Sequence, residues 1–176
     1  MTAKKVNHKN NKGTEVISYQ GRYITVTGLS SVDIQNIGDV CTDRSIKSLR
    51  NQEDLYEIVL ASIAQSDQEI VSRNEIDADV EARFDRLDHD DQEELIDSLD
   101  RVVDIFDIPM LERVIEESVG STLEQLADIE LIKEVDPTCE LDQAQYHLTT
   151  VGKVLSELAF GTDHTTTIVI KHRFHD

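Results

Sequence analysis

The stretch Leu123–Leu158, LEQLADIELIKEVDPTCELDQAQYHLTTVGKVLSEL, changes its hydrophobic pattern several times. Helical spacing gives way at Leu131 to LIKEV, which is typical of a strand. The DPT at 136–138 predicts a turn, and AQYHL predicts a returning strand. Thr149 is a good helix-capping residue, and Gly161 is a good helix terminator. We therefore expect helix, strand, turn, strand and helix in this order.

Upstream of this stretch, apolar residues recur at helical spacing. We expect one amphipathic helix in QEDLYEIVLASIAQ, a second in IDADVEARFDRL and a third that opens at Asp90. Their expected core faces are Leu55, Ile58, Val59 and Ile63; Ile76, Val80, Phe84 and Leu87; and Leu95, Leu99, Val102, Val103 and Phe106. A weaker capping signal, Ser30 followed by Asp33, predicts an earlier helix with Ile34, Ile37, Val40 and Cys41 on one face.

The third helix is interrupted by Asp107-Ile-Pro109, and proline is tolerated at a first helical position. A new helix should therefore start there and bury Leu111, Val114 and Ile115. We expect SVG at 118–120 to end it. The pattern Ser121-x-x-Glu124 is a capping box, so it predicts a separate short helix with Leu123, Leu126 and Ala127 inside.

The two ends of the chain have the composition of β-structure. EVISYQGRYITVTG at 15–28 predicts a β-hairpin around Gln20-Gly21. TTTIVIKHRF near the C-terminus predicts a strand with Ile168, Ile170 and Phe174 on one face. This strand could pair with the hairpin, because an isolated hairpin is marginal in water. The fold class that we expect is mainly α with small β elements, that is, α+β.

The order of elements from Asp90 to Gly161 resembles a winged helix–turn–helix domain. Its steps fall on Leu131, Ile132, Tyr146, Leu148, Thr149 and Gly152. The resemblance implies a recognition helix at Ser121–Glu130 followed by a wing. The alternative is a helical bundle decorated by a small hairpin. We accordingly divide the chain into a basic flexible arm (1–14), a hairpin with helices (15–89), a winged-helix-like region (90–161) and a terminal strand (162–176).

The net charge of −19 is unevenly distributed. Residues 1–22 carry five bases and one acid, whereas residues 53–136 carry 27 acids and six bases. Two interpretations remain open: adaptation to high salt, and an acidic surface that docks on a basic partner. Both make DNA binding through the acidic region unfavourable, because phosphates require Lys and Arg. The expected recognition helix itself contains Glu124, Asp128 and Glu130 and no base.

Motifs for catalysis and for metal binding are weak. Asp77-x-Asp79-x-Glu81 with Asp88 partly imitates a calcium loop, but Ala82 stands where glycine is needed, and the same residues suit a helix. His164, His172 and His175 are close in sequence, yet residues 172 and 175 of a strand point to opposite faces. No nucleophile elbow, phosphate-binding loop or HExxH occurs. We expect no enzyme activity and no cofactor.

The sequence also bears on where the protein works. It has no run of about 18 apolar residues, and no apolar stretch follows the basic N-terminus, so we expect neither a membrane helix nor a secretory signal. Cys41 and Cys139 are too far apart for a CxxC pair. These features favour an intracellular protein or a component of a virion.

The function that we expect is protein–protein interaction or assembly, with a protein partner, a second copy of the chain, or both. A structural or assembly component of a virus or phage particle belongs to this class. The alternative is a winged-helix transcriptional regulator that binds DNA, from a halophile. The expected contact residues are the basic arm and the acidic helices, namely Lys4, Lys5, Lys9, Lys12, Asp85, Asp88, Asp90, Asp91, Glu93 and Glu94.

Overall fold

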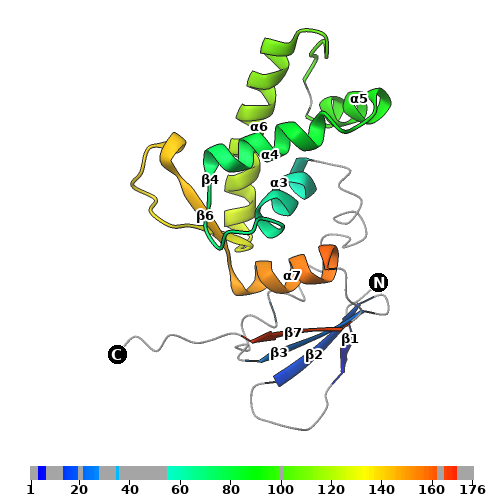
Figure 1. Ribbon diagram of the computed structural model, residues 1–176, viewed down its shortest axis with the longest axis vertical. Helices are drawn as coiled ribbons and strands as arrows, with labels where there is room; N and C mark the ends of the chain where they lie inside the picture. Colours follow the sequence, from blue (N-terminus) through cyan, green and yellow to red (C-terminus); the bar gives the residue numbers. More distant parts are fainter. Residues whose placement is uncertain are drawn as a thin grey trace. The chain divides into compact units, whose positions relative to one another are not determined.

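The computed structural model describes residues 4–6, 14–19, 22–27, 35, 55–99, 101–161 and 165–169. Its elements are mixed α and β, as expected from the sequence (Figure 1). Backbone contacts divide the chain into two units: unit 1 comprises Met1–Arg50 with Thr149–Asp176, and unit 2 comprises Asn51–Leu148. Unit 2 is thus inserted between the two parts of unit 1. The expected boundaries after residues 14, 89 and 161 do not coincide with this division.

Unit 1 contains a four-stranded sheet in the order β1-β2-β3-β7. The strands β2 (Thr14–Tyr19) and β3 (Arg22–Thr27) form the expected antiparallel hairpin. The strand β7 (Thr165–Val169) lies parallel to β3, so the terminal strand does pair with the hairpin (Figure 1). The strand β1 (Lys4–Val6) was not expected, because this segment is polar and basic. It pairs antiparallel with β2 inside the segment that we interpreted as an arm.

The helix of unit 1, α7 (Thr150–Phe160), begins and ends at the expected residues. The hydroxyl of Thr149 accepts a hydrogen bond of 3.1 Å from the Gly152 amide, and Gly161 caps the other end. The helix contacts β3. Its buried apolar residues are Val151, Val154, Leu155, Leu158 and Ala159.

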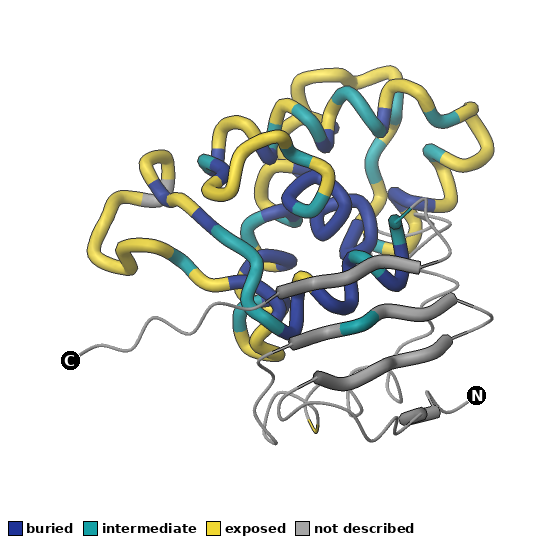
Figure 2. The backbone as a smooth tube through the Cα atoms, turned by 60° about the horizontal axis from the view of Figure 1, so that its bottom comes forward, coloured by how far each residue is buried: buried dark blue, intermediate teal, exposed yellow. Residues whose placement is uncertain are grey.

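In unit 2 the helix α3 (Leu55–Ala64) is buried along almost its whole length (Figure 2). The expected core residues Leu55, Ile58, Val59 and Ile63 are each at most 4% exposed. Residues on the opposite side of the helix are buried too, because α4, α6 and β6 all contact it. A helix that is apolar on most sides is typical of the centre of a core.

The short strand β4 (Val71–Ser72) leads directly into α4 (Arg73–Phe84), which starts with a capping box that our sequence analysis missed. The Ser72 hydroxyl accepts a hydrogen bond from the Glu75 amide, and the Glu75 carboxylate accepts one from the Ser72 amide at 2.8 Å. The expected stripe of Ile76, Val80 and Phe84 is buried. Because α4 covers Asp77 to Phe84, these residues do not form a calcium loop.

The helix α5 (His89–Ser98) is shorter than expected. We predicted that its core face continues to Phe106, but Val102 is fully exposed and Phe106 is 80% exposed. The carboxylate of Asp104 accepts a hydrogen bond from the Phe106 amide at 2.9 Å. Such a local turn competes with helix formation, as do β-branched residues. The apolar spacing was real, but the segment lies at the surface.

The helix α6 (Ile108–Asp128) is one continuous helix, so the predicted break at SVG and the new start at Ser121 are wrong. The buried residues Leu111, Val114, Ile115, Val119, Leu123 and Leu126 continue a single stripe across the predicted break. Gly120 inside it faces Arg73 of α4. Tertiary packing therefore overrides the local signals of a glycine and a capping pattern. The proline at the start of the helix was predicted correctly.

A reverse turn joins α6 to the predicted wing. Glu130 has a φ of 59°, in the left-handed region, and Leu131 donates a 3.0 Å hydrogen bond to the Leu126 carbonyl. This is the Schellman pattern of a helix end. The strands β5 (Ile132–Glu134) and β6 (Gln145–Leu148) follow and form the predicted antiparallel hairpin. The strand β6 also pairs with β4, which makes a three-stranded sheet in the order β4-β6-β5.

Several expected features lie outside the described residues. They include the helix after Ser30, except for Gln35, which is helical and exposed. They also include the C-terminal end of the last strand, with Ile170 and Phe174, and the three histidines of that region.

The capping box of α4 leads to a prediction about pH. Hydrogen bonds from Ser72 lower the pKa of the Glu75 carboxyl below its ordinary value of 4.5. The stability that Glu75 contributes is therefore present above pH 4.5 and is lost as the pH falls through the lowered pKa. We expect Glu75→Ala to reduce the free energy of unfolding at pH 7, and the deficit to shrink in acid. Urea unfolding between pH 3.5 and 7 measures this.

The matched control is Glu94→Ala, which removes an exposed helical carboxylate that makes no hydrogen bond within the described parts of the chain. A Glu75→Ala deficit that stays constant down to pH 3.5 would contradict the capping role.

Candidate functional site

The acidic residues that we expected to bind a partner lie together around the junction of α4 and α5. Asp85 caps the end of α4, and Asp88 caps the start of α5 by accepting a 3.0 Å hydrogen bond from the Asp91 amide. All of the predicted acids are exposed, namely Asp85, Asp88, Asp90, Asp91, Glu93 and Glu94. Of the predicted basic residues, Lys4 and Lys5 lie in β1 of unit 1, and Lys9 and Lys12 lie outside the described residues.

Next to these acids is a surface that includes Val102, Val103 and Phe106, which the sequence analysis assigned to the core. We call it the apolar segment and define it as residues 101–110. Its exposed large side chains are Val102, Phe106, Ile108 and Met110, and the last three are 80%, 59% and 50% exposed. Several large apolar side chains are thus exposed within ten residues of sequence, which makes this segment a candidate interaction site.

A hollow of about 330 Å³ lies between the apolar segment and α5. Its apolar lining includes Ile96, Val103 and Ile105, and its acidic lining is Glu93, Asp97 and Asp104. The ring of Phe106 lies 6.0 Å from the ring of His89, measured between centroids. The hollow thus combines apolar walls with negative charge.

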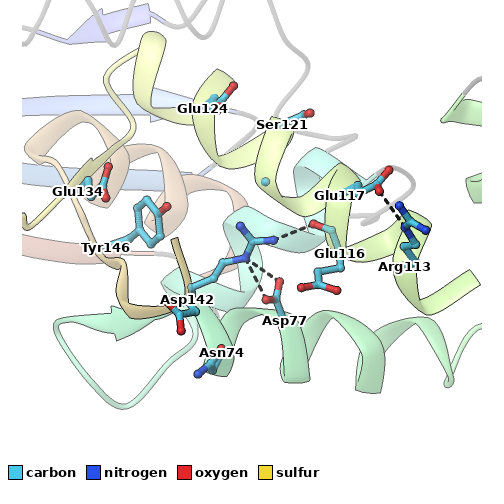
Figure 3. A pocket seen from close by; sticks show the side chains of 12 residues that line it. Asn74, Asp77, Arg113, Glu116, Glu117, Ser121, Glu124, Glu134, Asp142 and Tyr146 are labelled. Atoms are coloured by element: carbon cyan, nitrogen blue, oxygen red, sulfur yellow. Dashed lines mark hydrogen bonds and ion pairs between the residues drawn. The ribbon is translucent and has the colours of Figure 1, made fainter. Parts of the chain in front are cut away.

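A second, larger depression lies between α4, α6 and the β5–β6 hairpin (Figure 3). We call it the acidic groove, and its volume is about 600 Å³. Two arginines, Arg73 and Arg113, line it. Six carboxylates also line it: Asp77, Glu116, Glu117, Glu124, Glu134 and Asp142. Acids therefore outnumber bases, so the groove carries a negative charge.

Arg73 at the start of α4 forms the floor of the acidic groove. Its side chain is 10% exposed, and its Nε donates hydrogen bonds of 2.9 Å to both carboxylate oxygens of Asp77. Its Nη2 donates a 2.7 Å hydrogen bond to the Glu116 carbonyl, which ties α4 to α6. A Cβ at Gly120 would lie 3.3 Å from Nη1 of Arg73, so the guanidinium fits closely because residue 120 has no side chain.

The surroundings shift the pKa values of two groups in the groove. Burial raises the pKa of the Asp77 carboxyl and outweighs the opposing effect of Arg73. Burial, together with the charge of Glu134, raises the pKa of the Tyr146 hydroxyl. Tyr146 is 6% exposed and lies beside Glu134 (Figure 3). At neutral pH the phenol is therefore neutral and can both donate and accept a hydrogen bond.

The second half of α6 occupies the position of the expected recognition helix. Glu124 and Asp128 are exposed on it, and Glu130 follows it. Between residues 121 and 148 the only Lys or Arg is Lys133, which is exposed in β5. These side chains offer almost no positive charge to phosphates.

Local sequence patterns contain few signals that predict the acidic groove. Arg73 and Asp77 have the spacing of an ordinary surface ion pair on a helix. From the sequence pattern we interpreted Gly120 as the end of a helix, and Tyr146 as a residue of the wing. The one informative signal was the pattern Ser72-x-x-Glu75, which places Arg73 at the first position of a helix, next to a strand.

Two further findings concern the described residues only. Within the ranges that the structure describes, no helix combines the length and apolarity needed to cross a membrane. In the same ranges, no three side chains of His, Cys, Asp or Glu are grouped so that they could hold a metal ion.

Comparison with known proteins gave no match: no family model, curated protein or solved structure corresponds to this chain.

The environment of Arg73 leads to a prediction about stability. We expect Arg73→Ala to lower the free energy of unfolding by on the order of 3 kcal/mol, because it leaves Asp77 half-buried without its partner. The matched control is Arg83→Ala, which removes a more exposed ion pair with Asp79 on the same helix. That change should cost less than about 1 kcal/mol. Urea unfolding of both variants measures the difference, and equal losses would contradict a special role for Arg73.

Proposed function

We propose that the chain is a non-catalytic interaction protein that binds a protein partner through the apolar segment and the acidic residues beside it. The exposure of Val102, Phe106, Ile108 and Met110 carries this proposal. Each of these side chains would lose contact with water in a complex, and burial of apolar area is the main favourable term in protein association. A large aromatic side chain such as Phe106 is a good anchor for such a contact.

The charge around the apolar segment indicates the chemistry of the partner. Glu93, Asp97 and Asp104 line the hollow next to Phe106, and further acids lie along α5. A second acidic surface would be repelled, whereas a surface that carries Lys or Arg around apolar side chains would be attracted. We therefore propose a partner segment that is both amphipathic and basic.

A labelled peptide of alternating leucine and lysine tests this proposal. We expect it to bind the full chain in fluorescence anisotropy and a leucine–glutamate peptide of the same length not to bind. The change Phe106→Ser should weaken binding of the leucine–lysine peptide at least tenfold, with little effect on stability, because the side chain is already exposed.

The matched control for Phe106→Ser is Val135→Ser, which removes an exposed apolar side chain after β5, outside the apolar segment. This variant should bind the peptide as the unchanged chain does. Equal binding by all three proteins would mean that the peptide contacts another surface, and the proposal would fail.

A second candidate function is that of a winged-helix transcriptional regulator. The order α3, β4, α4, α6, β5 and β6, with α5 inserted after α4, supports it. So does the sheet order β4-β6-β5, in which the strand ahead of α4 pairs with the returning strand of the wing. A winged-helix fold does not itself imply DNA binding, and the negative charge of α6 favours a protein partner.

Anisotropy of a labelled random duplex, titrated in dilute and in molar potassium chloride, separates the two functions. We expect no binding in either buffer, because the second half of α6 and the hairpin carry a single base, Lys133. A surface that binds duplex DNA typically makes about six to ten phosphate contacts. Tight binding that weakens with salt would instead favour the regulator.

A further inference from the structure

The acidic groove shares no lining residue with the apolar segment, although α6 contributes residues to both. Its lining combines two arginines with six carboxylates. We infer that it binds a small zwitterion, namely an amino acid with a cationic side chain. The carboxylate of this ligand would lie against Arg73 and Tyr146, and its cationic side chain would lie among the carboxylates of the rim. This inference does not depend on the proposed protein partner.

The first observation is that some N–H groups of Arg73 have no hydrogen-bond acceptor among the described residues. A guanidinium has five N–H groups. Those of Arg73 that have partners are Nε–H, which faces Asp77, and one N–H of Nη2, which faces the Glu116 carbonyl. Within the described residues Nη1 makes no hydrogen bond, although the residue is only 8% exposed and lines the groove. A planar group with free donors in this position suits a carboxylate.

The second observation concerns Tyr146 of β6. It is 6% exposed, and its hydroxyl makes no hydrogen bond to any described residue. Figure 3 shows the ring at the groove with the hydroxyl turned toward α6. The ring is buried, but the hydroxyl is not among the fully buried polar atoms, so a ligand in the groove could reach it. A ligand oxygen held by Arg73 could also accept a hydrogen bond from this hydroxyl.

The third observation is the charge of the rim. Arg73 neutralises Asp77, and Arg113 lies 3.2 Å from Glu117, between Nε and Oε1. Four lining carboxylates have no ion pair within the described part of the chain: Glu116, Glu124, Glu134 and Asp142. They come from α6, from β5 and from the connection before β6, so they surround the groove on more than one side.

These three features together favour one class of ligand over a simple anion and a simple cation. A simple anion would be repelled by the four carboxylates, although Arg73 has donors for it. A simple cation would be attracted by the rim, but it would leave those donors and the Tyr146 hydroxyl without an acceptor. A zwitterion with an additional cationic side chain satisfies both. The volume of about 600 Å³ is within the range of about 300–1,000 Å³ that small-molecule sites have.

Isothermal titration calorimetry on the full chain tests the inference with three probes. L-Arginine has the carboxylate and the cationic side chain, agmatine lacks the carboxylate, and L-citrulline lacks the side-chain charge. We expect saturable binding of L-arginine, and binding of the other two at least tenfold weaker. Equal binding of agmatine and L-arginine would overturn the role of Arg73 and Tyr146, and absence of saturable L-arginine binding would overturn the inference as a whole.

Two variants locate the site without removing Arg73, which also holds the fold. Tyr146→Phe keeps the buried ring and removes the hydroxyl, and Glu124→Gln removes one exposed rim charge. Each should weaken L-arginine binding several-fold. The control Glu112→Gln changes an exposed carboxylate of α6 that does not line the groove, so it should leave binding unchanged. If Tyr146→Phe and Glu124→Gln bind as the control does, the ligand is elsewhere and the inference fails.

Discussion

The contact between the Arg73 guanidinium and α6 is the interaction on which the arrangement of unit 2 depends. It joins the first residue of α4 to the Glu116 carbonyl, holds Asp77 in place and leaves little room for a Cβ at position 120. The backbone amide of Arg73 also donates a 2.8 Å hydrogen bond to the Ala144 carbonyl, just before β6. One residue thus links α4 to α6 and to the hairpin, and the floor of the acidic groove results from this link.

The helix α6 relates the two candidate sites to each other. Ile108 and Met110 at its start belong to the apolar segment, and Glu116 to Glu124 in its middle and second half line the acidic groove. The same surface charge thus has two consequences. It favours a basic partner beside Phe106, and it restricts the groove to ligands that carry positive charge. Because few of these acids are paired within the described residues, salt should weaken both kinds of binding.

Much of the secondary structure could be predicted because its signals are local. The N-terminal hairpin, the stripe of α4, the strands β5 and β6 and the caps of α7 all follow from spacing and turn residues. The errors have tertiary causes. Nothing in the local sequence near Val102 and Phe106 indicates that these side chains are exposed. Nothing near Gly120 indicates that the buried stripe of α6 continues past it. The acidic groove could not be predicted, because α4, α6 and the hairpin each supply only part of it.

The sheet of unit 1 has a consequence for how the chain is made. Its strand β3 pairs with β7, and all of unit 2 lies between them in the sequence. During synthesis β1, β2 and β3 therefore leave the ribosome before unit 2, and β7 leaves it after unit 2. The sheet lacks its fourth strand until then. Unit 2 has its own sheet and its own buried helix, so it can fold during this interval. The parallel pairing with β7 closes a long loop, so it should be the slow, final step of folding.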